Sequence, residues 1–187
     1  MTAKFQNKYR ISTARLQNWD YGWNAPYFVT ICTQNRKCYF GDIVETQFSA
    51  SELGTLAQKY WNEIPQHFPF VQLDVFVLMP NHVHGIIIIN KNDDRDAINR
   101  VSTRQSQLEN NGGITGNNNP MLHENLSRII RWYKGRTSFE CRNIYADFAW
   151  QTRFHDHIIR DNKSYNKIKS YIIENPLKWN NDKFYNS

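Results

Sequence analysis

Two strand-forming runs separated by a two-residue break constrain this chain more than any other feature. Residues 71–79 (VQLDVFVLM) and 82–90 (HVHGIIIIN) are rich in β-branched and apolar side chains, and Pro80-Asn81 stands between them. Proline and asparagine favour a turn over the middle of a strand. The two runs therefore predict an antiparallel β-hairpin.

Strand-like and helix-like segments alternate along the rest of the chain. Two segments have the β-branched and aromatic composition of strands, residues 27–33 and residues 153–160. Three others place apolar side chains at helical spacing, residues 51–68, 122–142 and 162–174. Proline ends or bends a helix, so we expect Pro65 to end the first and Asn175-Pro176 the last, which Asp161 can cap.

The order of these elements predicts the fold class. Strand, helix, strand, strand, helix, strand is the β-α-β-β-α-β pattern of a ferredoxin-like sandwich. We expect an α+β fold of this kind, with an antiparallel sheet and helices packed on one face. The 187 residues form a single domain, 1–187, with a flexible polar insertion at about 91–120 that is rich in Asn, Asp and Gly. This insertion lacks the Gly-Lys-Ser/Thr of a phosphate-binding loop.

Composition excludes several classes of protein. The longest uninterrupted aliphatic run, Ile86 to Ile89, is far shorter than the ~20 residues of a membrane-spanning helix. The first residues have no apolar stretch typical of a secretory signal. The 3 cysteines form no Cys-x-x-Cys pair and predict neither a disulfide framework nor a zinc site. We expect a soluble cytoplasmic protein with no membrane partner.

Positive charge is concentrated in the last third of the chain. Residues 1–126 carry 11 Lys and Arg and 11 Asp and Glu, whereas residues 127–187 carry 12 and 6. Cationic residues interleaved with aromatic ones suit single-stranded nucleic acid, although solvated helix faces over an aromatic core have the same composition. The candidates for phosphate contacts are Arg131, Lys134, Arg136, Arg153, Arg160, Lys167 and Lys169.

His82-Val83-His84 is the sharpest local signal for chemistry. Side chains two residues apart on a strand point to the same side, so the two imidazoles share one face and can hold a divalent cation if a third ligand joins them. A pair of surface histidines on a half-exposed strand has the same spacing, and His155 and His157 repeat it.

The last predicted helix carries a possible nucleophile and a possible ligand. Tyr171 and Asn175 are four residues apart and so lie on one helix face, one turn from each other. Beside a two-histidine site they would supply a phenol and a neutral oxygen ligand. The same residues also fit a plain helix end, with a stacking tyrosine and an asparagine cap.

The sequence resembles the REP-associated tyrosine transposases, which are similar to other single-tyrosine transposases with a His-hydrophobic-His motif. The matching segments cover nearly all of the chain outside residues 91–120, and include residues 78–85 around the His pair, 150–160 and 171–176. The resemblance implies a ferredoxin-like domain that cuts and rejoins single-stranded DNA near hairpins through a 5′-phosphotyrosyl intermediate, with Mg²⁺ or Mn²⁺ as cofactor. It implies that His82, His84 and Asn175 bind the metal and that Tyr171 is the nucleophile. The other tyrosines of the basic region, Tyr133, Tyr145 and Tyr165, are weaker candidates for the nucleophile.

Two other functions share these features. A catalytically silent protein of the same fold would bind structured single-stranded DNA without cutting it. An RNA-binding sheet would need outward-facing aromatic side chains on its middle strands, and Phe76 is the only aromatic residue between residues 71 and 90. The oligomeric state, monomer or homodimer, is left open by the sequence.

Overall fold

The computed structural model describes residues 19–44, 47–91 and 123–185, together with residue 16 and the short strands β1 (Lys4–Phe5) and β2 (Lys8–Tyr9). These two strands pair with each other in an antiparallel arrangement. The predicted insertion at 91–120 lies, except for its first residue, outside the described residues. No helix in the described ranges is long and apolar enough to span a bilayer.

A four-stranded antiparallel sheet forms the centre of the molecule, as predicted. Its strands are β3 (Ala25–Cys32), β6 (Val71–Met79), β7 (His82–Ile89) and β8 (His155–Ile158), in the spatial order β6-β7-β3-β8. Every neighbouring pair is antiparallel, so β3 and β6 run parallel to each other with β7 between them. This is the strand order of a ferredoxin-like sheet, and it confirms the α+β fold.

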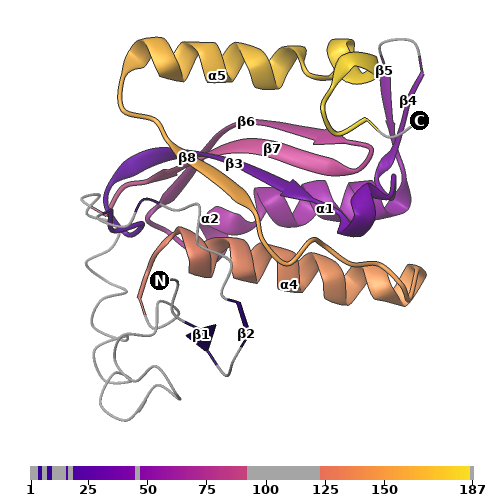
Figure 1. The fold of residues 1–187 in the computed structure, drawn as a ribbon, viewed down its shortest axis with the longest axis horizontal. Helices are drawn as coiled ribbons and strands as arrows, with labels where there is room; N and C mark the ends of the chain where they lie inside the picture. Colours follow the sequence, from indigo (N-terminus) through magenta and orange to yellow (C-terminus); the bar gives the residue numbers. More distant parts are fainter. Residues whose placement is uncertain are drawn as a thin grey trace.

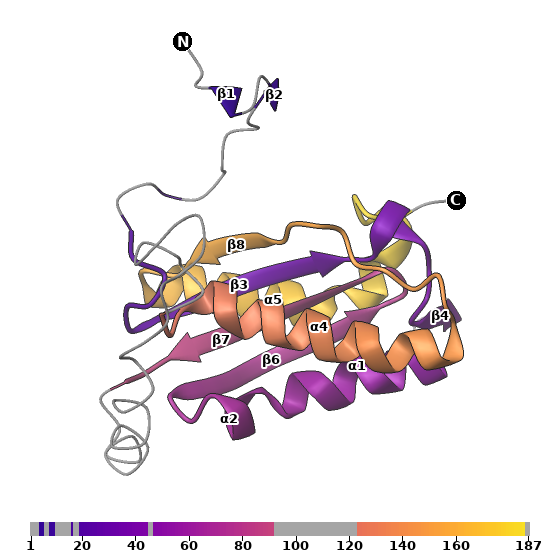
Figure 2. The ribbon, with the colours of Figure 1, turned by 90° about the horizontal axis from the view of Figure 1, so that it is seen from below.

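Helices cover both faces of the sheet, not one face only. Helices α1 (Glu52–Asn62), α2 (Ile64–His67) and α4 (Leu126–Ile144) lie on one side, and α5 (Asn162–Glu174) lies on the other (Figure 1). Seen from below, α1 and α4 run side by side across the sheet (Figure 2). The expected one-sided packing therefore holds for α1, α2 and α4, whereas α5 adds a third layer.

The two faces of the sheet carry apolar clusters of different size. The larger cluster fills the space between the sheet and helices α1 and α4, and includes Trp61, Ile87 and Tyr133. The smaller cluster joins Ile86 of β7 to Ile159 and to Ile172 of α5. Strand β7 is buried on both faces, and its run of isoleucines supplies apolar side chains to both clusters. This explains why α5 can pack on the second face.

The long helices begin where a side chain can cap them. Ser51 Oγ accepts a hydrogen bond from Gly54 N at the start of α1, and Asn125 Oδ1 accepts one from Arg128 N at the start of α4. Asp161 Oδ1 accepts from Ser164 N and starts α5, as the sequence predicted. Each such cap satisfies a backbone N–H that the helix itself leaves unpaired.

Several predicted boundaries shift in the structure. The segment 51–68 divides into α1 and α2, because Pro65 sits in the first turn of α2, where no backbone donor is needed. The predicted strand 153–160 shortens to β8, and the predicted helix 122–142 starts only after its Asn125 cap. Three further features were not predicted from the sequence: the hairpin of β4 (Gly41–Val44) and β5 (Gln47–Ala50), and the 3₁₀ helices η1 (Gln34–Arg36) and η5 (Pro176–Asn181).

Gly85 allows Trp61 to pack directly against the central strand. The fully buried Trp61 ring stacks on Phe76 with ring centroids 4.7 Å apart. A Cβ atom on residue 85 would lie 2.3 Å from Trp61 Cζ2, far inside van der Waals contact. The absence of a side chain between His84 and Ile86 is therefore a packing requirement.

We expect Gly85→Ala to lower the free energy of unfolding by about 1–3 kcal/mol, because the added methyl group displaces the Trp61 ring. Urea denaturation measures the change. Gly135→Ala is the matched control, since no tertiary contact from the described residues comes within 4 Å of a Cβ at that helical position. It should raise stability by roughly 0.5–1 kcal/mol through helix propensity. Equal effects of the two substitutions would contradict the proposed clash.

Candidate metal and nucleophile site

His82 and His84 leave β7 on the face that α5 covers. Val83, between them, is fully buried in the larger apolar cluster on the opposite face, as the strand alternation predicted. Both imidazoles are buried, His82 with 0% and His84 with 1% of its surface exposed. The pair is therefore a feature of the protein interior and not a pair of surface histidines.

The two rings converge through their Nε2 atoms. His82 Nε2 and His84 Nε2 lie 3.1 Å apart, while each Nδ1 has a partner of its own: Asn81 Oδ1 at 2.8 Å from His82 and Thr30 Oγ1 at 2.8 Å from His84. The Asn81 amide nitrogen donates to the carbonyl oxygens of Arg36 and Phe184, so its oxygen faces His82. His82 Nδ1 therefore carries the proton, and the Nε2 lone pair points toward His84. Such outer partners orient histidines that bind metals.

Both histidines are neutral at physiological pH. Burial, the neighbouring His84 and the charges of Lys183 and Arg36 hold the pKa of His82 well below its usual range. Burial, with Lys183 and His155, lowers the pKa of His84 to about 3. Neutral imidazoles are the form that binds a metal ion.

Helix α5 brings the predicted tyrosine to this pair. Tyr171 Oη lies 3.3 Å from His84 Nε2, and the two rings meet edge to face with centroids 5.3 Å apart. The phenol is 39% exposed, so a substrate can reach it. Burial and the Asp182 carboxylate raise the pKa of Tyr171, against a hydrogen bond with Asn175 that lowers it.

Asn175 lies one turn beyond Tyr171 and is buried, with 2% of its surface exposed. Its Nδ2 donates to Asp182 Oδ2 at 3.3 Å. Its Oδ1 is buried and has no hydrogen-bond partner within the described part of the chain. A buried carbonyl oxygen is costly to leave without a partner, so Oδ1 is available to a ligand.

Asp182, which was not predicted from the sequence, joins the two histidines in a set of possible metal ligands. One carboxylate oxygen of Asp182 and one nitrogen of each of His82 and His84 all lie within 4.8 Å of one another. The residue follows η5, which turns the chain back over the histidines, and Asp182 Oδ1 accepts a hydrogen bond from Phe184 N at 2.6 Å. An isolated aspartate near the end of the sequence has no spacing motif that could have identified it.

Hydrogen bonds and an ion pair to Asp74 of β6 hold α5 against the sheet. Tyr165 Oη donates a hydrogen bond to Asp74, and Lys169 Nζ lies 3.0 Å from Asp74 Oδ1. Burial by itself would raise the pKa of Asp74, but the hydrogen bonds from Tyr165 and Lys169 outweigh it and lower the pKa. Lys169, which the sequence offered as a phosphate contact, is engaged in this ion pair.

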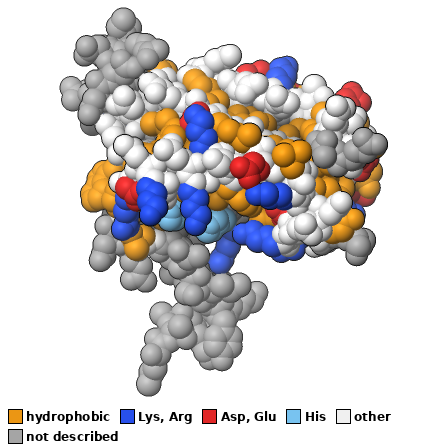
Figure 3. Space-filling model, turned by 90° about the horizontal axis from the view of Figure 1, so that it is seen from above, with side chains coloured by type: hydrophobic (Ala, Val, Ile, Leu, Met, Phe, Trp, Pro, Cys, Tyr) orange, Lys and Arg blue, Asp and Glu red, His pale blue; other side chains and the backbone are white. Residues whose placement is uncertain are grey.

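The other candidate phosphate contacts lie on both sides of the sheet. Lys134 is half-buried and its ammonium donates to the Gln151 carbonyl oxygen, whereas Lys167 is exposed on α5. Arg160 lies over the ring of Trp19, and Arg153 is exposed after α4. Figure 3 shows separate groups of Lys and Arg side chains on the α5 side. The remaining two residues, Arg131 and Arg136, are exposed on α4.

The second His-x-His pair lies on the edge strand β8. His155 is paired with Thr30 and His157 with Phe28 in the β3–β8 register, so both are on the face that carries His84. Both are exposed. They are not part of the group formed by His82, His84 and Asp182.

Comparison with known proteins finds two relatives of the chain. No protein-family model matches the sequence. An uncharacterised protein of Haemophilus influenzae is 37% identical over 172 residues, which cover 91% of each chain. A candidate REP-associated tyrosine transposase of the same organism is 28% identical over 161 residues, 85% of this chain and 74% of that one. The chain is homologous to the REP-associated tyrosine transposases.

A solved structure agrees with this homology at the level of the fold. It is a REP-associated tyrosine transposase bound to a REP hairpin, and it superposes with a TM-score of 0.55 over 89% of this chain and 74% of that chain, at 19% sequence identity. This transposase homologue thus shares the four-stranded sheet and packed helices of that protein, and it has the buried histidine pair on its second sheet face.

We expect Asp74→Asn to lower the free energy of unfolding at pH 7 by about 1–3 kcal/mol, because the charged acceptor of two hydrogen bonds is removed. The folded-state pKa of Asp74 lies below the ~3.9 of an unfolded chain, so its stabilisation is complete above that value and disappears as the pH falls through the folded-state pKa. Urea denaturation of both proteins between pH 7 and about pH 3 tests this.

Asp147→Asn is the control for that series, because it removes an exposed carboxylate. It should change stability little at either pH. If the difference in free energy of unfolding between wild type and Asp74→Asn stays constant down to pH 3, the charge of Asp74 does not anchor α5.

Proposed function

We propose that the protein cleaves and rejoins single-stranded DNA at sites flanked by hairpins, with Tyr171 as the nucleophile. The observation that carries the proposal is the position of Tyr171 Oη, 3.3 Å from His84 Nε2, at a group of metal-ligating side chains. Homology to REP-associated tyrosine transposases supports DNA as the substrate, and the related transposase of solved structure is bound to a REP hairpin.

The donor set fits a divalent cation. Two neutral imidazoles and the Asp182 carboxylate converge, and the unpaired Oδ1 of Asn175 is one turn from Tyr171 on the same helix. Nitrogen and oxygen ligands together suit Mn²⁺, and Mg²⁺ with its preference for oxygen is the other candidate. A bound cation would supply Lewis-acid stabilisation of the charge that develops on the scissile phosphate.

In the proposed reaction, Tyr171 forms a covalent bond to the DNA and later releases it. Tyr171 Oη attacks the phosphorus atom, the bond from phosphorus to the 3′-oxygen breaks, and a 5′-phosphotyrosyl bond forms. The phenol proton passes to solvent, and the departing 3′-oxygen takes up a proton to become a hydroxyl. Attack by another 3′-hydroxyl on the phosphotyrosine reverses these steps and restores a phosphodiester without a nucleotide cofactor.

Asn81 and Thr30 hold the two imidazoles in place during these steps, since each accepts or shares a hydrogen bond with a ring Nδ1. Asn175 lowers the pKa of Tyr171 through a hydrogen bond and so favours the ionised phenol. Burial and Asp182 act in the opposite direction. Without a cation beside it, the phenol therefore stays protonated at neutral pH.

We expect the wild-type protein, incubated with hairpin-flanked single-stranded DNA and Mn²⁺, to form a covalent protein–DNA adduct, and Tyr171→Phe to form none. Denaturing gel electrophoresis of labelled DNA detects the adduct. Tyr145→Phe is the control and should retain it, because Tyr145 is exposed at the end of α4, the helix on the opposite side of the sheet from the histidines. An adduct with Tyr171→Phe would disprove the assignment of the nucleophile, and no adduct with any protein would favour a silent DNA-binding protein.

Metal binding can be tested without DNA. Calorimetric titration with Mn²⁺ should show one site that His84→Ala abolishes, and Thr30→Val should weaken it by about 10- to 100-fold because the hydrogen bond to His84 Nδ1 is removed. His155→Ala, on the same sheet face, is the control and should bind normally. Unchanged Mn²⁺ affinity in His84→Ala would exclude the proposed site.

A further inference from the structure

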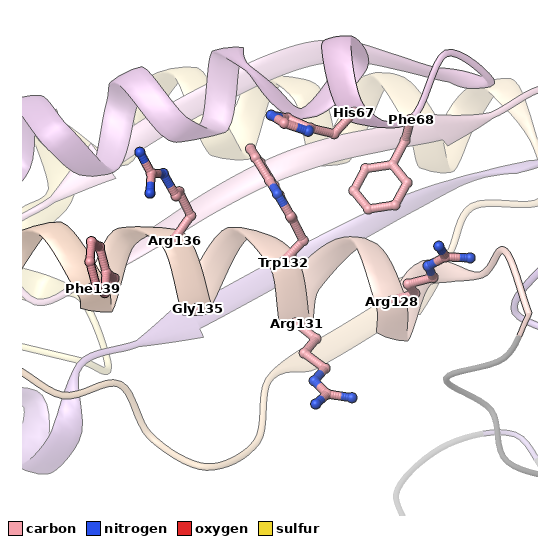
Figure 4. A pocket seen from close by; sticks show the side chains of 8 residues that line it. All are labelled: His67, Phe68, Arg128, Arg131, Trp132, Gly135, Arg136 and Phe139. Carbon is pink, nitrogen blue, oxygen red and sulfur yellow. The ribbon is translucent and has the colours of Figure 1, made fainter. Parts of the chain in front are cut away.

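A groove between α2 and α4 lies on the opposite side of the sheet from Tyr171. It has a volume of about 630 Å³. His67 and Phe68 line one wall, and residues of α4 line the other (Figure 4). The proposed cleavage chemistry uses none of these residues.

The groove is strongly basic. Arg128, Arg131 and Arg136 all line it and all are exposed. Arg136 forms an ion pair with Glu140 at 2.9 Å, whereas neither of the other two has an acidic partner among the described residues. Arg128 and Arg136 are eight residues apart, on the order of 12 Å along the helix axis. They are therefore placed to contact different phosphates of one strand.

Two aromatic rings of α4 line the groove together with these cations. Trp132 points across the groove toward His67 (Figure 4), with ring centroids 4.1 Å apart. Phe139 is 63% exposed, which is unusual for a large apolar ring. Rings that line a groove beside arginines are suited to stacking against nucleic-acid bases, while the arginines bind the backbone.

Gly135 leaves the middle of the groove open. It lies inside α4, where glycine costs helix stability, and a Cβ atom there would meet no tertiary neighbour within 4 Å in the part of the chain that the structure describes. No packing contact within the described residues therefore requires glycine at this position. The bare backbone leaves room for a ligand between Trp132 and Phe139.

We propose that this groove binds an unpaired segment of the DNA substrate, away from the cleaved bond. The inference rests on the proposed function for the identity of the ligand and deepens it by naming a second binding surface. Three arginines without a matching number of acids favour a polyanion over an apolar protein segment. Since the groove and Tyr171 lie on opposite faces of the sheet, the bound segment must be distant from the cut.

Substitutions at Gly135 test the groove without removing any native side chain. Gly135→Gln and Gly135→Glu have nearly the same shape and differ in charge. We expect Gly135→Glu to bind a fluorescein-labelled 12-nucleotide oligothymidine DNA about tenfold more weakly than Gly135→Gln, by fluorescence anisotropy at about 0.1 M salt. Its affinity should also depend less on salt. The slope of the logarithm of affinity against the logarithm of salt concentration should become less steep by about 0.7 for each phosphate of the single strand that the arginines no longer neutralise.

Asn143→Glu controls for net charge, because it places the same carboxylate on an exposed position of α4 outside the groove. It should bind the oligonucleotide more tightly than Gly135→Glu. Equal melting temperatures of the two Gly135 variants would confirm that the comparison is between folded proteins. Equal affinities of Gly135→Gln and Gly135→Glu would overturn the proposal, and so would tighter binding of the matching oligouridine RNA.

The two proposals fail separately. If wild-type protein forms the tyrosyl adduct but the Gly135 variants bind DNA equally, the groove is not a binding site and the cleavage function stands. If no adduct forms but Gly135→Glu still binds more weakly, the groove binds DNA in a protein that does not cut it.

Discussion

The packing of α5 on the second face of the sheet is the interaction on which the candidate site depends. Ile172 is completely buried against Ile86 and Ile159, and burying such a side chain contributes roughly 1.5–3 kcal/mol. Asp74 receives hydrogen bonds from the same helix and fixes its rotation about its axis. With Ile172 facing the sheet, Tyr171 lies beside His84 and Asn175 follows one turn later. The nucleophile is therefore positioned by interactions made several residues away from it.

Strand β7 fixes the other half of the site through its alternation. Val83 and Ile87 face the larger apolar cluster, and Gly85 between them makes room for Trp61. His82 and His84 must then face α5. A slip of one residue in the register would exchange the two faces and bury a histidine among the apolar side chains of the main core. The core behind the sheet thus determines where the imidazoles lie.

The elements that could be predicted from the sequence are those whose bounds or faces are set by residues close together in the chain. Pro80-Asn81 indicated the strand bounds of the hairpin, and Asp161 with Asn175-Pro176 indicated the bounds of α5, because turn and cap residues act within a few positions. The alternation of β7 and the helical spacing of Tyr171 and Asn175 identified these side chains as neighbours on their own elements. That they meet required the family resemblance, since spacing alone does not tell which sheet face a helix covers.

The remaining parts depend on interactions between distant segments. Asp182 reaches the histidines only because η5 reverses the chain after Pro176, and no periodicity encodes that reversal. Composition likewise could not show that Lys169 binds Asp74 or that Lys134 binds the Gln151 carbonyl, although both were predicted to contact phosphates. A lysine counts equally in a net charge whether its ammonium faces solvent or an internal acceptor.

The distribution of charge over two faces bears on how a strand of DNA would be held. Eight of the 12 basic residues after residue 126 lie on α4 or α5, which are on opposite sides of the sheet. Binding groups far from the reacting bond can orient a substrate without touching the reacting atoms. If Tyr171 cuts the strand, its modest exposure and the buried histidines give the site little surface with which to bind DNA. Most of the binding free energy must then come from cations outside the site. The exposed arginines of α4 that line the groove are such a group of cations.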